Sequence, residues 1–90
     1  MYKVETSSAV DKIFSKLSKK NQKQLEIITR KVEEILENPQ HYKNLRKPLQ
    51  FLKAVHIDKH FVLTFSVDEN NKLVMLEDYD HHDKIYEKSK

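Results

Sequence analysis

The sequence predicts a single α+β domain, in which an antiparallel sheet of about four strands packs against an N-terminal helical hairpin and a short C-terminal helix. Two neighbouring segments of the first half repeat apolar residues at helical spacing, and three segments of the second half have the apolar or alternating pattern of strands. No linker or repeat divides the 90 residues, so we expect one domain over residues 1–90.

The first half begins with a short predicted strand over residues 2–5, where apolar and polar residues alternate. Ser7 or Ser8 can cap the next helix, because a serine hydroxyl accepts a hydrogen bond from a free N–H group of the first turn. The apolar face of this helix consists of Val10, Ile13, Phe14 and Leu17. Ser18 is the expected cap of a second helix, which should end at Asn-Pro (38–39) because the residue before a proline avoids helical conformation. The apolar face of the second helix consists of Leu25, Ile28, Val32, Ile35 and Leu36.

The second half contains three predicted strands, over residues 52–57, 61–67 and 73–79, and a final helix over residues 83–88. A polar and basic connector over residues 41–50 joins the two halves. The predicted order of elements is therefore β-α-α-β-β-β-α.

The faces of these strands depend on the turn between the first two. If residues 58–59 form a two-residue hairpin turn, Ile57 pairs with His60. Lys53 and His60 then point outward, and His56 lies on the core side of the sheet or at its rim. We therefore expect His56 to be a half-buried histidine, unless it serves a site at that rim.

Composition excludes several classes of function. The chain has no cysteine, which excludes disulfides and thiolate metal sites, and no glycine, which argues against glycine-rich phosphate loops and a nucleotide cofactor. No apolar run approaches the ~20 residues of a membrane span, and the first residues do not resemble a signal peptide. We therefore expect a cytoplasmic protein without a membrane partner.

The charge is uneven along the chain. Residues 1–50 carry 11 Lys/Arg and 6 Asp/Glu, whereas residues 51–90 carry 6 Lys/Arg and 8 Asp/Glu. With a sequence pI near 9.1, this excess permits a polyanionic partner without requiring one. Arg46, Lys47 and Lys53 are candidates for pairing with phosphate, or they belong to an ordinary solvated basic surface.

The segment 78–86 is the strongest candidate for a site, because an apolar strand leads directly into two histidines, three aspartates and two tyrosines. Histidine titrates near neutral pH and is a common proton-transfer group. If the chain turns helical near His81, His82 and Tyr86 share an exposed face, while His81 is partly buried or hydrogen-bonded. The alternatives are polar residues that merely end a strand, or a metal site, which would need a third and distant ligand.

The order of elements and two segments, residues 55–65 and 80–86, resemble the RelE/ParE superfamily of toxins from toxin–antitoxin pairs. The likeness covers almost the whole chain. The second segment looks like the C-terminal active-site strand and helix of RelE-like and YafQ-like mRNA interferases. The resemblance implies a single RelE-like toxin domain that cuts mRNA on the ribosome without a metal or cofactor. It also implies a RelB-like antitoxin partner.

The resemblance also implies roles for individual residues. By position, His82 matches a catalytic basic residue, Tyr86 an aromatic residue one helical turn later, and His56 a functional histidine of YafQ-like members. Such enzymes deprotonate the ribose 2′-OH, protonate the 5′ oxygen and stabilise the charged phosphorane. His56 and His60 compete for the second acid/base role. The expected phosphate-binding residues are Arg46, Lys47, Lys53 and Lys59.

The sequence departs from the family pattern at two points. Val62 stands where RelE-like enzymes carry a phosphate-binding arginine, and three aspartates place negative charge beside the expected site: Asp78, Asp80 and Asp83. Two alternative functions therefore stay open. One is a ParE-like inhibitor of DNA gyrase, which needs no acid/base pair, and the other is a protein-binding module without catalysis.

Overall fold

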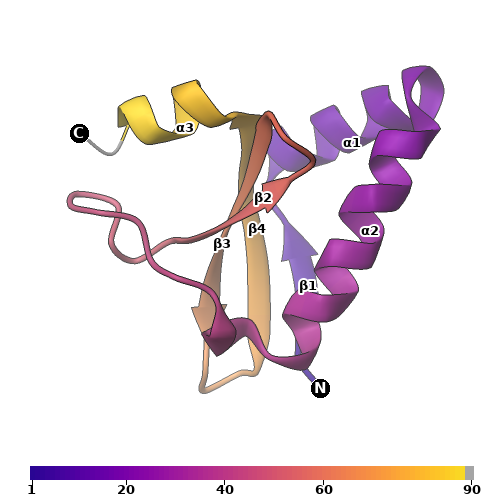
Figure 1. Ribbon diagram of the computed structural model, residues 1–90. Helices are drawn as coiled ribbons and strands as arrows, with labels where there is room; N and C mark the ends of the chain where they lie inside the picture. Colours follow the sequence, from indigo (N-terminus) through magenta and orange to yellow (C-terminus); the bar gives the residue numbers. More distant parts are fainter. Residues whose placement is uncertain (89–90) are drawn as a thin grey trace.

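The computed structural model describes residues 1–88 and has a four-stranded sheet covered by two long helices on one face (Figure 1). A short C-terminal helix lies against the other face. The elements are β1 (Lys3–Thr6), α1 (Ser8–Lys20), α2 (Gln22–Glu37), the 3-10 turn η1 (Pro39–His41), β2 (Lys53–Ile57), β3 (Phe61–Asp68), β4 (Leu73–His81) and α3 (His82–Lys88). The predicted fold class and order are confirmed. No helix within the described residues is long and apolar enough to cross a membrane.

The sheet has the strand order β1-β4-β3-β2. The β2–β3 and β3–β4 pairs are antiparallel as expected, whereas β1 pairs with β4 in parallel, from Lys3 opposite Leu73 to Thr6 opposite Leu76. A parallel pair needs a long crossover connection, and the helical hairpin supplies one between β1 and the rest of the sheet. The sheet is therefore mixed rather than wholly antiparallel.

Polar side chains set the helix boundaries. The Ser7 hydroxyl accepts a hydrogen bond from the Val10 N–H at 3.1 Å, so Ser7 caps α1. The expected cap of α2 at Ser18 is wrong, because Ser18 lies inside α1 and donates back to the Ser15 carbonyl at 2.7 Å. Asn21 caps α2 instead, since its side-chain oxygen accepts from the Gln24 N–H at 3.1 Å.

Both faces of the central strand β3 are buried. On one face the helices and the sheet enclose the main core: Val10, Ile28, Ile35, Val55, Ile57, Leu63, Phe65, Val74, Leu76 and Tyr79. On the opposite face a smaller cluster forms beneath α3: Leu45, Leu52, Val62 and Ile85. This second cluster fixes α3 and the connector before β2 to the sheet, and it was not foreseen from the sequence.

The β2–β3 connection corrects the predicted strand faces. Ile57 pairs with Phe61 and His56 with Val62, so the loop has three residues, 58–60, instead of two. Asp58 adopts a left-handed conformation (φ 58°), which aspartate tolerates better than most residues, and its carboxylate accepts the Lys59 N–H at 2.8 Å. A shift of one residue exchanges the two faces of a strand. Val55 and Ile57 therefore enter the main core, and His56 faces α3 as an exposed side chain.

A bulge in β4 changes the faces of its second half. Phe65 pairs with Leu76 but Thr64 pairs with Asp78, which leaves Glu77 as an extra residue in the ladder. Val74 and Leu76 face the main core before the bulge, and Tyr79 does so after it. The bulge thus moves the odd-numbered residues of the terminal part of β4 onto the helical side. The strand ends at His81, two residues beyond the predicted end.

Gln24 and Tyr79 form a polar pair inside the core. The Gln24 side-chain amide donates to the Tyr79 hydroxyl at 2.7 Å, and the two residues are 8% and 5% exposed. Burial raises the pKa of Tyr79, although the hydrogen bond from Gln24 acts in the opposite direction. The pair links α2 to β4 and satisfies two groups that would be costly to bury alone.

We predict that Tyr79→Phe lowers the free energy of unfolding by about 1–3 kcal/mol, because the buried Gln24 amide loses its acceptor. Urea denaturation measures this change. The double variant Tyr79→Phe/Gln24→Leu should recover part of the loss, since neither polar group is then left without a partner. Equal stability of wild type and Tyr79→Phe would show that the hydrogen bond contributes nothing to the fold.

Candidate functional site

The site forms where α3 begins and folds back over the sheet. The His82 N–H donates to the His60 carbonyl at 2.7 Å, which fixes the first residue of α3 to the β2–β3 loop. One turn later Ile85 is 2% exposed and packs in the cluster beneath α3. These two contacts place α3 across the face of the sheet from which His56 projects.

Three rings from two distant segments meet at this place. The His56 and His82 rings stack with centroids 5.4 Å apart and planes inclined by 18°. The Tyr86 ring lies 4.5 Å from His82 and 6.4 Å from His56. His82 and Tyr86 therefore share one face of the helix as predicted, but Tyr86 is half-buried against the cluster beneath α3 instead of exposed. His56 joins the pair because of the loop register.

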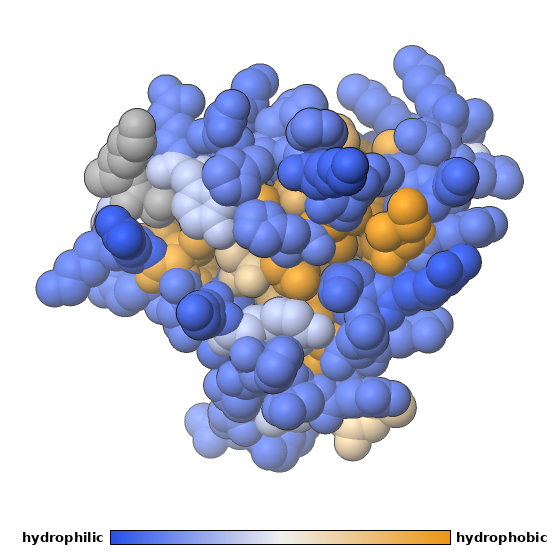
Figure 2. All heavy atoms as spheres, in the orientation of Figure 1, coloured by the Kyte–Doolittle hydropathy of each residue, from blue (hydrophilic) through white to orange (hydrophobic). Residues whose placement is uncertain are grey.

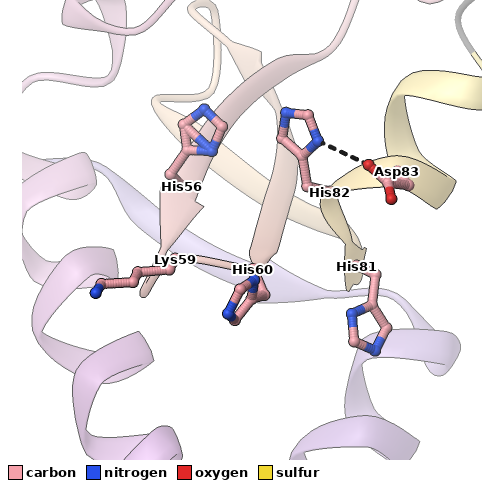
Figure 3. A pocket seen from close by; sticks show the side chains of 6 residues that line it. All are labelled: His56, Lys59, His60, His81, His82 and Asp83. Atoms are coloured by element: carbon pink, nitrogen blue, oxygen red, sulfur yellow. Dashed lines mark hydrogen bonds and ion pairs between the residues drawn. The ribbon is translucent and has the colours of Figure 1, made fainter.

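An open hollow of about 470 Å³ lies beside the stacked histidines. Its lining residues are His56, Lys59, His60, His81, His82 and Asp83, and all six are exposed (Figure 3). The hollow thus contains four histidines, one lysine and one carboxylate. Protonation of any of the imidazoles adds positive charge to that of Lys59, so the site has the chemistry to receive a phosphate.

Asp83 orients the His82 ring. Its carboxylate oxygen lies 3.3 Å from His82 Nδ1, and the two side chains are 100% and 48% exposed. In the tautomer with the proton on Nδ1, that nitrogen donates to Asp83 and Nε2 keeps a lone pair for accepting a proton. The aspartate next to the histidine in sequence was expected only as a source of negative charge, and this orienting contact was missed.

The other two aspartates of the segment bind backbone N–H groups. Asp78 accepts from the Tyr79 N–H and Asp80 from the His81 N–H, each at 2.8 Å. Their charge is therefore partly compensated by local hydrogen bonds. His81 was expected to be partly buried or hydrogen-bonded. Its side chain is exposed, its backbone N–H is bonded to Asp80, and its ring lies 4.5 Å from that of Phe61.

Several predicted phosphate-binding residues lie away from the hollow. Lys53 is 9% exposed, and its ammonium donates to the Tyr42 carbonyl at 3.0 Å and to the Asn44 side chain at 3.1 Å. The expectation that Lys53 points outward is therefore wrong. Arg46 and Lys47 are exposed in the connector before β2, and neither lines the hollow. Of the four predicted residues, the structure brings only Lys59 to the histidines.

Val62, which stands where the resemblance leads one to expect an arginine, does not belong to the histidine site. Val62 is fully buried in the cluster beneath α3 and does not line the hollow. Within the described part of the chain, no three His, Asp or Glu side chains form a group that could hold a metal ion. The site can transfer protons and bind an anion through the residues already named.

No family model matches the chain. Two relatives cover nearly all of it. An uncharacterized protein of Methanosarcina mazei is 64% identical over 86 residues, which cover 96% of this chain and 100% of the relative. A predicted toxin of Methanocaldococcus jannaschii, RelE4, is 59% identical over 90 residues, which cover 100% of this chain and 96% of the relative.

Two solved structures share the fold. YafQ from Escherichia coli BL21(DE3) superposes with a TM-score of 0.71 at 17% identity, covering 96% of this chain and 99% of YafQ. A chain of the toxin–antitoxin complex RelBE2 from Mycobacterium tuberculosis superposes with a TM-score of 0.67 at 20% identity. The match covers 90% of this chain and 98% of that chain. The fold is thus the one that these two chains share. Together with the identity to RelE4 over its full length, it shows that the chain belongs to the RelE toxin family.

The contacts of Lys53 and Lys59 predict different effects of removing the two side chains on stability. Lys53→Ala should lower the free energy of unfolding by about 1–3 kcal/mol, because the Tyr42 carbonyl and the Asn44 amide lose a charged donor. Lys59→Ala should change it by less than about 0.5 kcal/mol, because the side chain is exposed. Urea denaturation of both variants checks this, and equal stabilities would contradict a structural role for Lys53.

Proposed function

We propose that this toxin is an endoribonuclease that cuts mRNA in the ribosome, with His56 and His82 as its proton-transfer pair. The stack of the two imidazoles at 5.4 Å, on the wall of an open hollow that also holds Lys59, is the observation that carries the proposal. Two imidazoles facing one anion-binding hollow provide both groups that cleavage of a phosphodiester by its own 2′-OH requires.

The chemistry assigns a separate role to each histidine. His82 takes the proton of the ribose 2′-OH through Nε2, because its Nδ1 faces Asp83. The 2′ oxygen then bonds to the adjacent phosphorus, and the bond from phosphorus to the 5′ oxygen breaks. Protonated His56 gives its proton to that leaving oxygen, so the products are a 2′,3′-cyclic phosphate and a free 5′-hydroxyl. Proton transfers of this kind contribute about 10²–10⁴-fold each to a rate.

Lys59 and Tyr86 support this pair. Lys59 is the lysine of the hollow, and its ammonium can neutralise the charge that develops on the phosphorane. Tyr86 lies with its ring 4.5 Å from that of His82 and holds the imidazole against His56. His60 contributes its carbonyl to the start of α3 and its side chain to the wall of the hollow. We therefore favour His56 over His60 for the second proton-transfer role.

The exposure of the hollow supports a requirement for the ribosome. All six lining side chains are exposed, so the toxin alone offers few contacts that would hold an RNA strand in line for attack. A ribosome presents mRNA in a fixed conformation and supplies that positioning. A cytoplasmic location of the toxin follows from this proposal.

We also propose a RelB-like antitoxin as the partner of the toxin. The RelBE2 neighbour comes from a toxin–antitoxin complex. The surface offers places where a partner can bury apolar groups: Phe51 is 64% exposed beside a hollow of about 230 Å³ that also contains Leu49 and Ile85. In the orientation of Figure 1, apolar groups reach the surface in patches between hydrophilic side chains (Figure 2).

The proposal is tested by cleavage of a defined mRNA on programmed ribosomes and free in solution. Wild type should cut on the ribosome, and His82→Ala and His56→Ala should each cut about 10²–10⁴-fold more slowly. His41→Ala is the matched control, because His41 is also exposed but lies in η1 outside the hollow. Primer extension locates and quantifies the cuts.

Other outcomes point to other functions. Wild-type cleavage that both substitutions leave unchanged would contradict the assignment of the histidine pair. Intact mRNA under all conditions would contradict the nuclease. Inhibition of supercoiling by DNA gyrase would then establish the ParE-like alternative, and no effect on gyrase would favour a purely binding role.

A further inference from the structure

A second hollow lies on the helical side of the sheet, across the end of β4 from His82. It measures about 560 Å³, and its walls include Ile13, Lys16 and Leu17 of α1 together with Phe61, Tyr79 and His81 of the sheet. None of these residues has a role in the proton transfers proposed above. The histidine hollow and this one share His81, which lines both.

Aromatic rings form one wall of the second hollow. The Phe61 and Tyr79 rings are parallel within 4°, with centroids 5.2 Å apart, and the His81 ring lies 4.5 Å from Phe61 at an inclination of 32°. Tyr79 is buried, Phe61 is half-buried and His81 is exposed. The series of rings thus runs from the core to the surface and ends at a flat imidazole. Figure 3 shows the His81 ring turned away from His56 and His82.

The charges around this hollow suit a base better than a phosphate. Asp78 and Asp80 also line it, and their carboxylates repel an anion inside. Lys16 stands on the helical wall of this hollow and is exposed on α1. A phosphate is therefore attracted to the outer surface of α1, while a neutral ring can enter between the aliphatic groups of α1 and the aromatic wall.

We propose that the second hollow binds a nucleobase of the RNA strand, next to the nucleotide whose phosphate occupies the histidine hollow. The inference rests on the proposed function and adds a subsite to it. His81 stacks on the base and Lys16 contacts its neighbouring phosphate. Because every base has a flat face, this subsite should accept any base. The contribution of stacking to binding should therefore be lost when the base is removed, but not when one base replaces another.

The first test compares cleavage of three mRNAs on programmed ribosomes. One mRNA is intact, and each of the other two has an abasic ribose on a different side of the scissile bond. For wild type, one of the two abasic positions should lower kcat/KM about tenfold, the factor that stacking of a single base typically supplies. His81→Ala should lower kcat/KM for the intact mRNA by about the same factor. For this variant, the abasic substitution at that position should lower kcat/KM no further. His81→Phe keeps a flat ring and should keep most of the activity.

Lys16→Ala tests the phosphate contact, and Lys19→Ala is its matched control, because Lys19 lies on the same exposed surface of α1 but lines neither hollow. Lys16→Ala should raise KM and weaken its dependence on salt concentration, whereas Lys19→Ala should not. If the abasic substitutions slow wild type and His81→Ala by the same factor, the subsite is refuted while the nuclease stands.

A second measurement separates failure of the subsite from failure of the proposed function. A short RNA with a 2-aminopurine base and a 2′-deoxy nucleotide at the scissile position cannot be cut, and stacking quenches its fluorescence. Wild type and His81→Phe should quench it, and His81→Ala should not. This result would support the subsite even for a protein that cuts no mRNA. Equal quenching by all three proteins, or no quenching by wild type on the programmed ribosome, would overturn it.

Discussion

The position of α3 on the sheet is the constraint on which the site depends. A helix of seven residues is too short to be stable alone, and this one is held by the buried side chain of Ile85 and by the hydrogen bond from the His82 N–H to the His60 carbonyl. These contacts bring His82, which follows β4, over His56 of β2, although β3 separates the two strands. Any change that lifts α3 from the sheet therefore separates the two imidazoles without altering either.

Two local irregularities determine which side chains reach the site. The loop over residues 58–60 has one residue more than a tight hairpin turn, and it places His56 on the face beneath α3. The bulge at Glu77 moves His81 to the helical side, so that His81 reaches the second hollow whereas the next residue, His82, lines only the histidine hollow. Each irregularity shifts the pairing of a strand by a single residue. Such a shift moves the side chains of that strand from one face of the sheet to the other.

The order of elements and their approximate bounds were predictable, because apolar periodicity along α1, α2 and the strands reflects burial on one face. The strand faces around His56 were not, because residues 58–60 can form a turn of two residues or of three, and only the observed pairing of Ile57 with Phe61 decides between them. Burial of Lys53 could not be predicted either, since it depends on the Tyr42 carbonyl, which lies in a connector without periodic pattern. The nearness of His82 to Tyr86 followed from helical spacing alone.

The central claim is that His56 and His82 act as one unit, and a double-mutant cycle on ribosome-dependent cleavage tests it most directly. The rates to compare are those of wild type, His56→Ala, His82→Ala and the double variant. The structure predicts that the double variant is hardly slower than either single variant, because each step of proton transfer needs both groups in place. If the two losses multiply, the imidazoles contribute independently, and the proposed acid/base pair is wrong.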